Sequence, residues 1–359
     1  MDAATAAPLA PAAPPTPDAV DLARAAGQGP LDYLRARGYV QDVTDEAGLR
    51  AAFAAGPVTL YQGFDPSAAS LHIGNLLGIM MLAATQRFGH RPIALAGGGT
   101  MLVGDPSGKT STRALLDSEA IAANLAGIKT QFARHLDFAG GAFVADPPNP
   151  AAMLLDNADW LLELRYIPFL RDVGRHFSVN EMLTAETYRT RLQEGGGGLN
   201  FVEFNYRLVQ AYDFLYLSRT EGCALQIGGS DQWGNIVAGV DLVRKADGGK
   251  AFGLVCPLLT TASGQKLGKS VGNSVWLDPA LTSPYDYYQH WVNTEDADVA
   301  RLLRLFTFLP EDRIAALTAA SGRALREAKA VLAREATALQ HGPEASAEAE
   351  AASRALFGG

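Results

Sequence analysis

The sequence predicts an α/β protein with a doubly wound parallel sheet, followed by a small all-α domain. Two stretches, 58–96 and 224–245, each run from a buried apolar strand through a turn into a helix. Units of this kind pair their strands in parallel through right-handed crossovers. After Pro279 the periodicity is helical, which predicts the second domain. We therefore expect the functional site beyond the carboxyl ends of the strands, where doubly wound sheets bind their ligands.

Each element of the two units follows from a local pattern. The first unit begins with a strand at 58–64 and a turn at 65–70. A helix at 76–88, closed by Gly89, and a second strand at 91–96 follow. The second unit contains a strand at 224–229 and a helix for which Ser230 or Asp231 is the expected cap.

The remaining segments are assigned from composition and periodicity. Residues 1–28 form an Ala/Pro-rich tail with too few large apolar groups to offset the entropy of ordering, so we expect disorder there. A helical insertion at about 114–200 interrupts a sheet domain that spans 29–256. After this domain we expect a mobile loop region at 257–280, a helical domain at 281–342 and, at 343–359, an Ala/Glu-rich linker or frayed helix.

Composition excludes several classes of protein. The formal net charge of −8 argues against a nucleic-acid coat held by bulk positive charge, and the five basic residues between Arg313 and Arg334 are interpreted as a solvated helix face. No apolar run approaches the length of about 20 residues that spans a membrane, and the first residues lack a secretory pattern. Two cysteines, Cys223 and Cys256, are too few for a disulfide framework, so we expect reduced thiols and a cytoplasmic location.

The first candidate motif joins a strand end to a helix start. YQGFD at 61–65 is followed by HIGN at 72–75, so free backbone N–H groups of the helix face the crevice and favour phosphate. Gly74 lets a ligand approach the backbone, and His72 and Asn75 can donate hydrogen bonds one helical turn apart. Taken alone, a capping or core histidine is the preferred interpretation of His72.

The second candidate motif is a glycine-bounded loop, GQKLGKS at 264–270. Its two ammonium groups, on Lys266 and Lys269, could close on a triphosphate and stabilise the charge of a leaving pyrophosphate. Taken alone, the loop is an exposed turn.

A third glycine-rich cluster resembles a P-loop, but the spacing is wrong. Only three residues separate Gly104 from Gly108-Lys109, whereas a P-loop has four. What remains is a carboxylate, Asp105, after a strand end, with Lys109 and Arg113 on a segment that we expect to be mobile.

The fourth candidate group lies on a predicted helix. Tyr206, Gln210 and Asp213 are spaced by four and three residues and so share one face. Burying these polar groups without partners would be costly, so they either face solvent or line a polar pocket. The pattern alone does not decide between these two interpretations.

In this order, the motifs resemble those of the class I aminoacyl-tRNA synthetases, and within them the bacterial tyrosyl-tRNA synthetases. The resemblance runs from about Leu31 to Gly342 and rests on YQGFDPS and HIGN at 61–75, GDPSGK at 104–109, QAYDFL at 210–215, QIGGSDQWGN at 226–235 and KLGKS at 266–270. It implies a Rossmann-type catalytic domain that joins L-tyrosine to ATP, releases pyrophosphate, and transfers tyrosine to the 3′ end of tRNA(Tyr). It also implies a homodimer, a helical domain that contributes to tRNA binding, Mg²⁺ that enters with ATP, and no protein-bound metal.

The resemblance also implies roles for individual residues. The residues expected to hold the phosphates in catalysis are His72, Asn75, Lys109, Arg113, Lys266, Lys269 and Ser270. The residues expected to bind tyrosine are Tyr61 and Asp213 at the phenol, Asp105, Tyr206 and Gln210 around the ammonium, and Gln226 behind them. The residues expected to contact ATP or the adenylate are Gly63, Asp65, Gly74, Gly229, Asp231, Gln232 and Lys269.

The sequence departs from the family pattern in three places. Asn75 replaces the second histidine of the HIGH motif, and Leu267 and Gly268 alter the KMSKS motif, but the hydrogen-bond donors are kept, so we expect activity. The small basic RNA-binding domain that usually follows the helical domain is not part of this sequence, so we expect adenylate formation but less efficient tRNA charging.

Two other functions remain open at this point. A tryptophanyl-tRNA synthetase would share the fold, and Tyr61 with Asp213 is the pair that argues against it. A catalytically inactive RNA-binding homologue is the other alternative, which the retained lysines, His72 and the pocket carboxylates disfavour.

Overall fold

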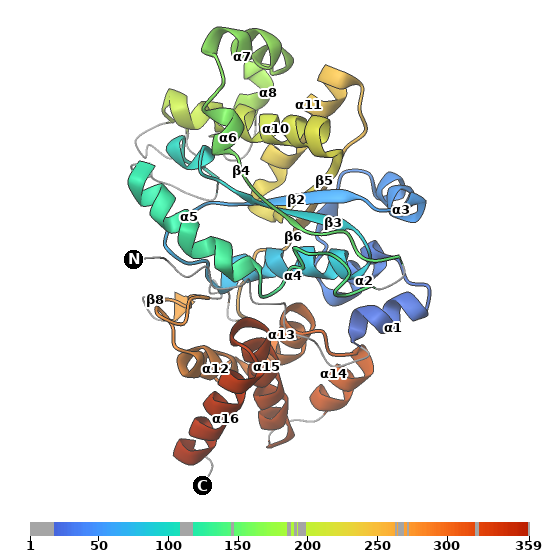
Figure 1. Ribbon diagram of the computed structural model, residues 1–359, viewed down its shortest axis with the longest axis vertical. Coiled ribbons are helices and arrows are strands. Elements are labelled where there is room, and N and C mark those ends of the chain that lie inside the picture. Colours follow the sequence, from blue (N-terminus) through green and yellow to red (C-terminus); the bar gives the residue numbers. More distant parts are fainter. Residues whose placement is uncertain are drawn as a thin grey trace.

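The sheet predicted from the sequence is present. The computed structural model describes residues 18–107, 118–144, 147–184, 188–189, 192, 199–262, 264, 269–270, 273–319 and 323–357. Its main sheet has six strands in the order β1-β6-β5-β2-β3-β4, shown edge-on in the middle of Figure 1. The strands are β1 (Asp42–Val43), β2 (Thr59–Phe64), β3 (Arg91–Ala96), β4 (Met153–Asp156), β5 (Cys223–Gly229) and β6 (Phe252–Cys256).

The strand order defines where a ligand can enter. From β2 the chain proceeds outward to β3 and β4, whereas β5 returns to the other side of β2 and is followed by β6. These five strands are parallel, and only the edge strand β1 is antiparallel. The order therefore reverses between β2 and β5, and the carboxyl ends of these two strands flank the crevice in which such sheets bind ligands.

Helices cover both faces of the sheet. One face packs on α4 (Ile73–Arg87), the other on α10 (Phe201–Glu221) and α11 (Trp233–Asp247), with separate apolar clusters on the two sides. The helices before β2 are α1 (Ala19–Ala25), α2 (Pro30–Arg37) and α3 (Glu46–Ala55). Those between β3 and α10 are η1 (Thr100–Leu102), α5 (Ser118–Phe132), α6 (Ala158–Leu161), α7 (Tyr166–Asp172), η2 (Gly174–His176) and α8 (Val179–Thr184).

Two details of the sheet domain differ from the expectation. The segment expected to be a helical insertion, 114–200, also supplies β4. This strand has only four residues, so it does not interrupt the helical periodicity of the sequence around it. Neither Ser230 nor Asp231 caps α11, because both lie in a short helix, η3 (Ser230–Gln232), and Gln232 occupies the cap position without a side-chain hydrogen bond.

The tail expected to be disordered contains α1, so that expectation is wrong for residues 19–25. Asp18 caps this helix and also forms an ion pair of 2.9 Å with Arg87 at the end of α4. The Arg87 guanidinium lies 4.1 Å from the ring centre of Phe143 and 4.2 Å from that of Phe308. A buried ion pair and the apolar Val20 therefore anchor a segment whose composition alone suggested disorder. Residues 1–17 lie outside the described part of the chain.

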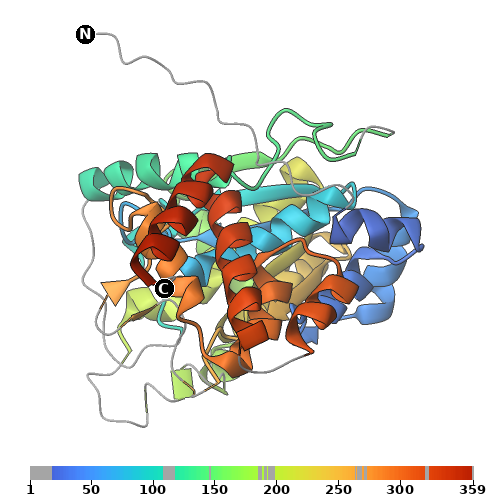
Figure 2. The same ribbon diagram turned by 90° about the horizontal axis from the view of Figure 1, so that it is seen from below.

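The C-terminal helices pack directly against the sheet domain. They lie below it in Figure 1, and Figure 2 views the molecule from their side. They are α12 (Pro284–Val292), η4 (Asp296–Asp298), α13 (Val299–Phe306), α14 (Glu311–Thr318), α15 (Arg323–His341) and α16 (Pro343–Phe357). One apolar cluster runs from α4 into these helices, so the helical part is not a separately packed unit. Of the two expectations for 343–359, the helix is correct and the linker is wrong, because α16 buries Ser346 and Ala349 against its neighbours.

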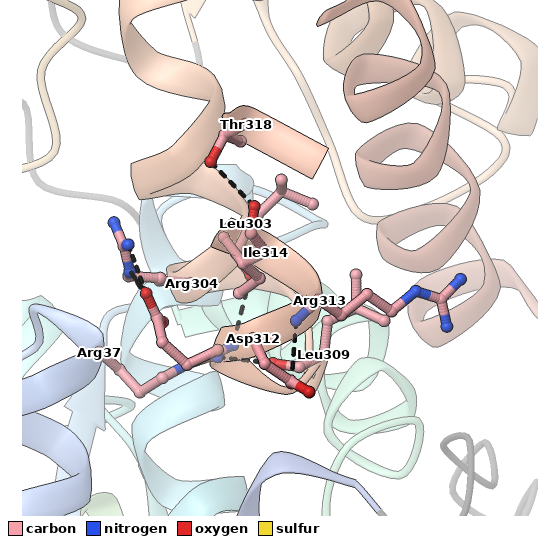
Figure 3. A network of polar contacts seen from close by, with 9 residues as sticks. Arg37, Leu303, Arg304, Leu309, Asp312, Arg313, Ile314 and Thr318 are labelled. Atoms are coloured by element: carbon pink, nitrogen blue, oxygen red, sulfur yellow. Dashed lines mark hydrogen bonds and ion pairs between the residues drawn. The ribbon is translucent and has the colours of Figure 1, made fainter. Parts of the chain in front are cut away.

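An arginine of α2 joins the two parts of the chain. Arg37 donates hydrogen bonds to the carbonyl oxygens of Leu309 (2.8 Å), Leu303 (3.3 Å) and Thr307. Figure 3 shows Arg37 beside Leu309, at the end of α13 and the start of α14. A cation at the carboxyl end of a helix satisfies its last carbonyl groups and stabilises the helix dipole. Among the described helices, none is both long and apolar enough to span a membrane.

Candidate active site

A polar cavity of about 200 Å³ lies at the carboxyl ends of β2 and β5. We call it the inner cavity. It lies at the position where the strand order reverses. Eleven of the residues predicted from the sequence line it: Tyr61, Gly63, Asp65, Asn75, Asp105, Tyr206, Gln210, Asp213, Gln226, Gly229 and Gln232. They come from β2, α4, α10, β5 and the turns that follow the strands, so the fold brings together residues that are far apart in the sequence.

Helix α10 presents its polar face to this cavity. Tyr206 and Asp213 are 5% and 2% exposed, and both line the cavity together with Gln210. The sequence alone left open whether this face met solvent or a pocket, and the structure places it against a pocket. The structure therefore excludes the interpretation in which this face of α10 meets solvent.

Several buried polar atoms of the inner cavity have no protein partner. Among the described residues, Tyr61 Oη and the Oε1 atoms of Gln62, Gln210 and Gln226 make no hydrogen bond. Each such group costs about 1–3 kcal/mol when it is buried and unsatisfied. Burial also raises the pKa of Tyr61 well above its usual value, so this phenol keeps its proton. The cavity thus offers hydrogen-bond donors and acceptors to a small polar ligand.

Asp213 is the buried carboxylate of the cavity. Its Oδ2 accepts a hydrogen bond of 2.9 Å from Asn157 Nδ2, and its Oδ1 accepts one of 2.8 Å from Trp160 Nε1. Burial raises the pKa of Asp213 to about 7, although these two hydrogen bonds act in the opposite direction. Asn157 and Trp160 therefore orient the carboxylate and favour its charged form.

We expect Trp160→Phe to raise the pKa of Asp213 further. The substitution removes the indole N–H but keeps an aromatic ring where Trp160 stacks on Tyr216 with a centroid distance of 4.4 Å. Carboxyl ¹³C NMR titration measures this shift. Tyr216→Phe is the matched control, because among the described residues Tyr216 makes no hydrogen bond to Asp213. An Asp213 pKa that is unchanged in Trp160→Phe would contradict the role assigned to the indole.

A second carboxylate, Asp105, lies in a network of polar side chains. Its Oδ2 accepts a hydrogen bond of 2.8 Å from Gln232 Nε2, and its Oδ1 accepts one from Ser107 N. Asn235 Nδ2 in turn donates to Gln232 Oε1 and Ser107 Oγ, both at 3.2 Å. The network fixes Asp105 at the wall of the cavity, where a positively charged group of a ligand can pair with it.

A second cavity, of about 350 Å³, opens beside the first and is lined by the start of α4, and we call it the outer cavity. His72, Gly74 and Asp231 line it, and Asn75 and Gly229 line both cavities. His72 is the N-cap of α4: its Nδ1 accepts a hydrogen bond of 3.0 Å from Gly74 N, and Asn75 Oδ1 accepts one of 3.1 Å from His72 N.

The cap also decides which ring nitrogen of His72 can donate. Because Nδ1 is an acceptor, the neutral ring carries its proton on Nε2. His72 therefore caps the helix and also lines the outer cavity with a potential donor. The capping interpretation and the phosphate-binding interpretation are thus compatible.

The glycine-bounded loop returns to the same place. After β7 (Lys269–Ser270) and β8 (Asn273–Ser274), Val275 O accepts a hydrogen bond from Ile73 N and Leu277 N donates to Leu71 O. Ser274, which pairs with Lys269 in the hairpin, lines the outer cavity. The backbone of β7 is therefore close to the start of α4. The side chains of Lys269 and Ser270, and the whole of Lys109, Arg113 and Lys266, lie outside the described part of the chain.

Sequence reasoning missed four residues of the site: Gln62, Thr100, Asn157 and Trp160. Asn157 follows β4 directly, as Asp65 follows β2, and a polar residue at the end of a parallel strand is a signal for a site. The helical periodicity expected for 114–200 hides β4, and with it this signal. Gln62 is the polar residue between Tyr61 and Gly63, which both belong to the first motif, and it lines both cavities.

A polar cavity at the switch point of a doubly wound sheet, adjoined by a second cavity beside a helix start, is typical of α/β proteins that bind a nucleotide. Comparison with known proteins defines the family. The model of the tRNA synthetases class I (W and Y) matches residues 54–358. The chain therefore belongs to the class I tRNA synthetases of the tryptophan and tyrosine group.

Two curated relatives of this chain are tyrosine–tRNA ligases. The chain is 56% identical to a tyrosine–tRNA ligase of Desulfosudis oleivorans over 328 residues, which are 91% of this chain and 73% of that protein. It is 53% identical to a tyrosine–tRNA ligase of Syntrophus aciditrophicus, with the same shares covered.

Solved structures agree with the fold. A C-terminally truncated mitochondrial tyrosyl-tRNA synthetase of Aspergillus nidulans superposes with a TM-score of 0.81 at 30% identity, over 94% of this chain and 97% of that one. A tryptophanyl-tRNA synthetase of Encephalitozoon cuniculi reaches 0.60 at 17% identity, over 92% and 91% of the two chains. The second likeness shows the fold alone, which tyrosine and tryptophan enzymes share.

Proposed function

We propose that the protein is a tyrosine–tRNA ligase, which activates L-tyrosine with ATP and transfers it to the 3′ end of tRNA(Tyr). The observation that carries the proposal is the inner cavity, in which the buried Tyr61 hydroxyl and the Asp213 carboxylate line the same space. A phenol that donates to Asp213 and accepts from Tyr61 would satisfy both groups. The identity of the curated relatives supports the same assignment.

The rest of tyrosine fits the other end of the cavity. Asp105 supplies a carboxylate for the ammonium group, and Tyr206 and Gln210 lie on the same helix as Asp213. Phenylalanine would leave the buried Tyr61 hydroxyl unpaired and would offer Asp213 no donor beyond Asn157 and Trp160. Enzymes of this family are themselves the usual example of such discrimination. An indole has no hydroxyl at the corresponding position, which disfavours tryptophan for the same reason.

ATP would occupy the outer cavity and reach the inner one at the residues they share. Gly63 would leave room for the reacting groups, because a Cβ there would meet no protein atom within 4 Å. Gln62, Asn75 and Gly229 line both cavities, where the α-phosphate must meet the tyrosine carboxylate. The donors at the start of α4 would stabilise the charge of the departing pyrophosphate. Their proposed partners in this role are Lys109, Arg113, Lys266, Lys269 and Ser270. Mg²⁺ enters as part of the ATP substrate.

The test is amino-acid-dependent ATP–pyrophosphate exchange, measured beside charging of tRNA(Tyr) on the same preparation. We expect exchange with tyrosine and none with tryptophan or phenylalanine. Exchange that depends on tryptophan would identify the alternative enzyme, and no exchange with any amino acid would support an inactive RNA-binding homologue. The curated relatives named above are of the bacterial type, and we propose a cytoplasmic location for this protein.

We also propose that two copies of the chain form a dimer through an apolar surface at the end of the molecule that carries α7. Large apolar side chains are unusually exposed on and around α7, α8 and the start of α10, including Ile167 (70%), Phe201 (66%), Leu162 (64%), Tyr166 (61%) and Val179 (57%). These helices lie together at the top of Figure 1. Exposed apolar patches of this kind mark interaction surfaces.

We expect Ile167→Asp to convert the dimer into a monomer, because it places a charge in the centre of an apolar interface. Sedimentation velocity or light scattering measures the mass. Leu356→Asp is the control, since Leu356 is 67% exposed on α16, away from this surface. A wild type that is already monomeric, or a dimer that survives the Ile167 substitution, would contradict the assignment.

A further inference from the structure

A third cavity, of about 170 Å³, lies where α10 and α11 meet the segment 176–182. We call it the side cavity. Figure 1 shows α10 and α11 next to each other, with α7 and α8 close by. Arg207 of α10 lines this cavity and is absent from the inner one. It follows Tyr206, and successive residues of a helix point about 100° apart, so one helix serves two separate cavities.

Arg207 is a buried cation without a counter-ion. It is 9% exposed, its Nε has no hydrogen-bond partner, and no carboxylate of the described residues pairs with it. Its guanidinium lies 4.9 Å from the ring centre of Tyr188, which offers only a cation–π contact. Burial lowers the pKa of Arg207, yet an arginine stays charged in proteins. A buried charge without a partner is destabilising unless something else compensates it.

The surroundings of Arg207 favour an anion. A Cβ on Gly234 would lie 2.7 Å from Arg207 Nη2, so the guanidinium lies against the first turn of α11. The amino end of a 15-residue helix adds positive potential there. The nearest acid of α11 is already neutralised, because Asp241 pairs with Arg244 at 3.1 Å and Lys245 at 3.7 Å. Glu181, at the rim, is exposed to solvent.

Five of the other eleven lining residues are apolar, and the polar ones are His176, Ser178, Glu181, Asp241 and Lys245. Phe177, Met182, Val237, Ala238 and Leu242 form walls beside the cation. Such walls suit a hydrocarbon body rather than a fully hydrated ion.

We propose that the side cavity binds a small carboxylate with an apolar body, its carboxylate paired with Arg207 and its body against Phe177, Met182 and Leu242. The planar guanidinium fork matches a carboxylate in bidentate geometry. This site is independent of the activation of tyrosine.

The test is thermal unfolding of the full chain with L-tyrosine present at saturation, so that the inner cavity is already occupied. The probes are cyclohexanecarboxylate, the matched neutral alcohol cyclohexylmethanol, and inorganic phosphate. We expect only the carboxylate to raise the Tm, by several degrees and in a concentration-dependent manner. We expect Arg207→Met to have a higher Tm than the wild type without probe, to show no response to the carboxylate, and to retain tyrosine-dependent exchange.

Two further variants locate the effect. Arg219→Met removes the same charge from an exposed part of α10 that does not line the side cavity, and it should respond like the wild type. Val237→Trp fills the cavity while it keeps Arg207, and should not respond. The proposal is overturned if the wild type shows no shift, if Arg207→Met responds as the wild type does, or if the alcohol or phosphate produces the same shift as the carboxylate.

Discussion

The kcat/KM for tyrosine in ATP–pyrophosphate exchange is expected to fall as the pH drops below about 7. In the unliganded protein, burial raises the pKa of Asp213 from 3.8 to about 7, so the carboxyl is increasingly protonated in this range. A protonated carboxyl no longer accepts a charge-assisted hydrogen bond from the substrate phenol. Such bonds contribute about 1.5–3 kcal/mol, or roughly ten- to a hundredfold in binding. The pH profile of kcat/KM reports the free enzyme, in which this group titrates.

Asp213→Asn should lower kcat/KM for tyrosine by about 100-fold at pH 8 and remove the dependence on pH near 7. Asp241→Asn is the control, because this carboxylate is partly exposed and lies outside the inner cavity. If Asp213→Asn kept the profile of the wild type, another group would be responsible for the titration and the assigned role of Asp213 would be wrong.

The same carboxyl should make the protein less stable as the pH rises. The pKa of Asp213 is higher in the folded protein than in the unfolded chain, so the folded state binds the proton more tightly. The resulting stabilisation is complete below about pH 4 and is lost as the pH rises through about 7, by an amount on the order of a few kcal/mol. Urea unfolding between pH 4 and 8 measures this slope, which should be flatter in Asp213→Asn. Tyrosine recognition and stability therefore depend on pH in opposite directions.

Two substitutions of His72 should separate its two roles, the helix cap made by Nδ1 and the donor that Nε2 offers to the outer cavity. Asn can supply the acceptor of the helix cap but not the distal Nε2 donor, whereas Gln can place a donor at the distal position but loses the cap. We expect His72→Asn to unfold at the temperature of the wild type and to lose about 100-fold in the kcat of exchange, as for the removal of one transition-state donor. We expect His72→Gln to lose about 1 kcal/mol of stability and to keep more of the activity.

Thermal unfolding and exchange kinetics on the same samples distinguish the two roles. Ser283→Ala, which removes the N-cap of α12, controls for the loss of a helix cap outside both cavities. If the activity of both His72 variants simply followed their stability, His72 would act only as a cap.

The sequence predicted the parts of the fold in which one pattern dominates. β3 occupies the predicted range 91–96 because RPIALA is a short apolar run bounded by a glycine turn and followed by Gly97. β4 was missed because four residues, none of them fully buried, do not interrupt a helical periodicity. The order of α1 and α16 could not be predicted for a different reason: their composition is poor in large apolar groups, and tertiary contacts such as the ion pair of Asp18 with Arg87 hold them in place.

The site was predictable where a motif carried it and not where the fold assembled it. His72, Asp105 and Asp213 belong to recognised motifs, and the structure places each of them at a cavity. Trp160 and Asn157 meet Asp213 only because β4 ends beside α10, which no local pattern reveals. Gln62 likewise lines both cavities only because β2 lies at the switch point of the sheet.

The unbroken apolar cluster between α4 and the C-terminal helices determines how the protein melts. Leu302, Leu303 and Trp291 are fully buried and belong to the same cluster as Leu76 and Met80 of α4. Neither part can unfold without exposing hydrocarbon of the other, so calorimetry should record a single cooperative transition. A fragment that consisted of residues 281–359 alone would expose this surface to water and aggregate.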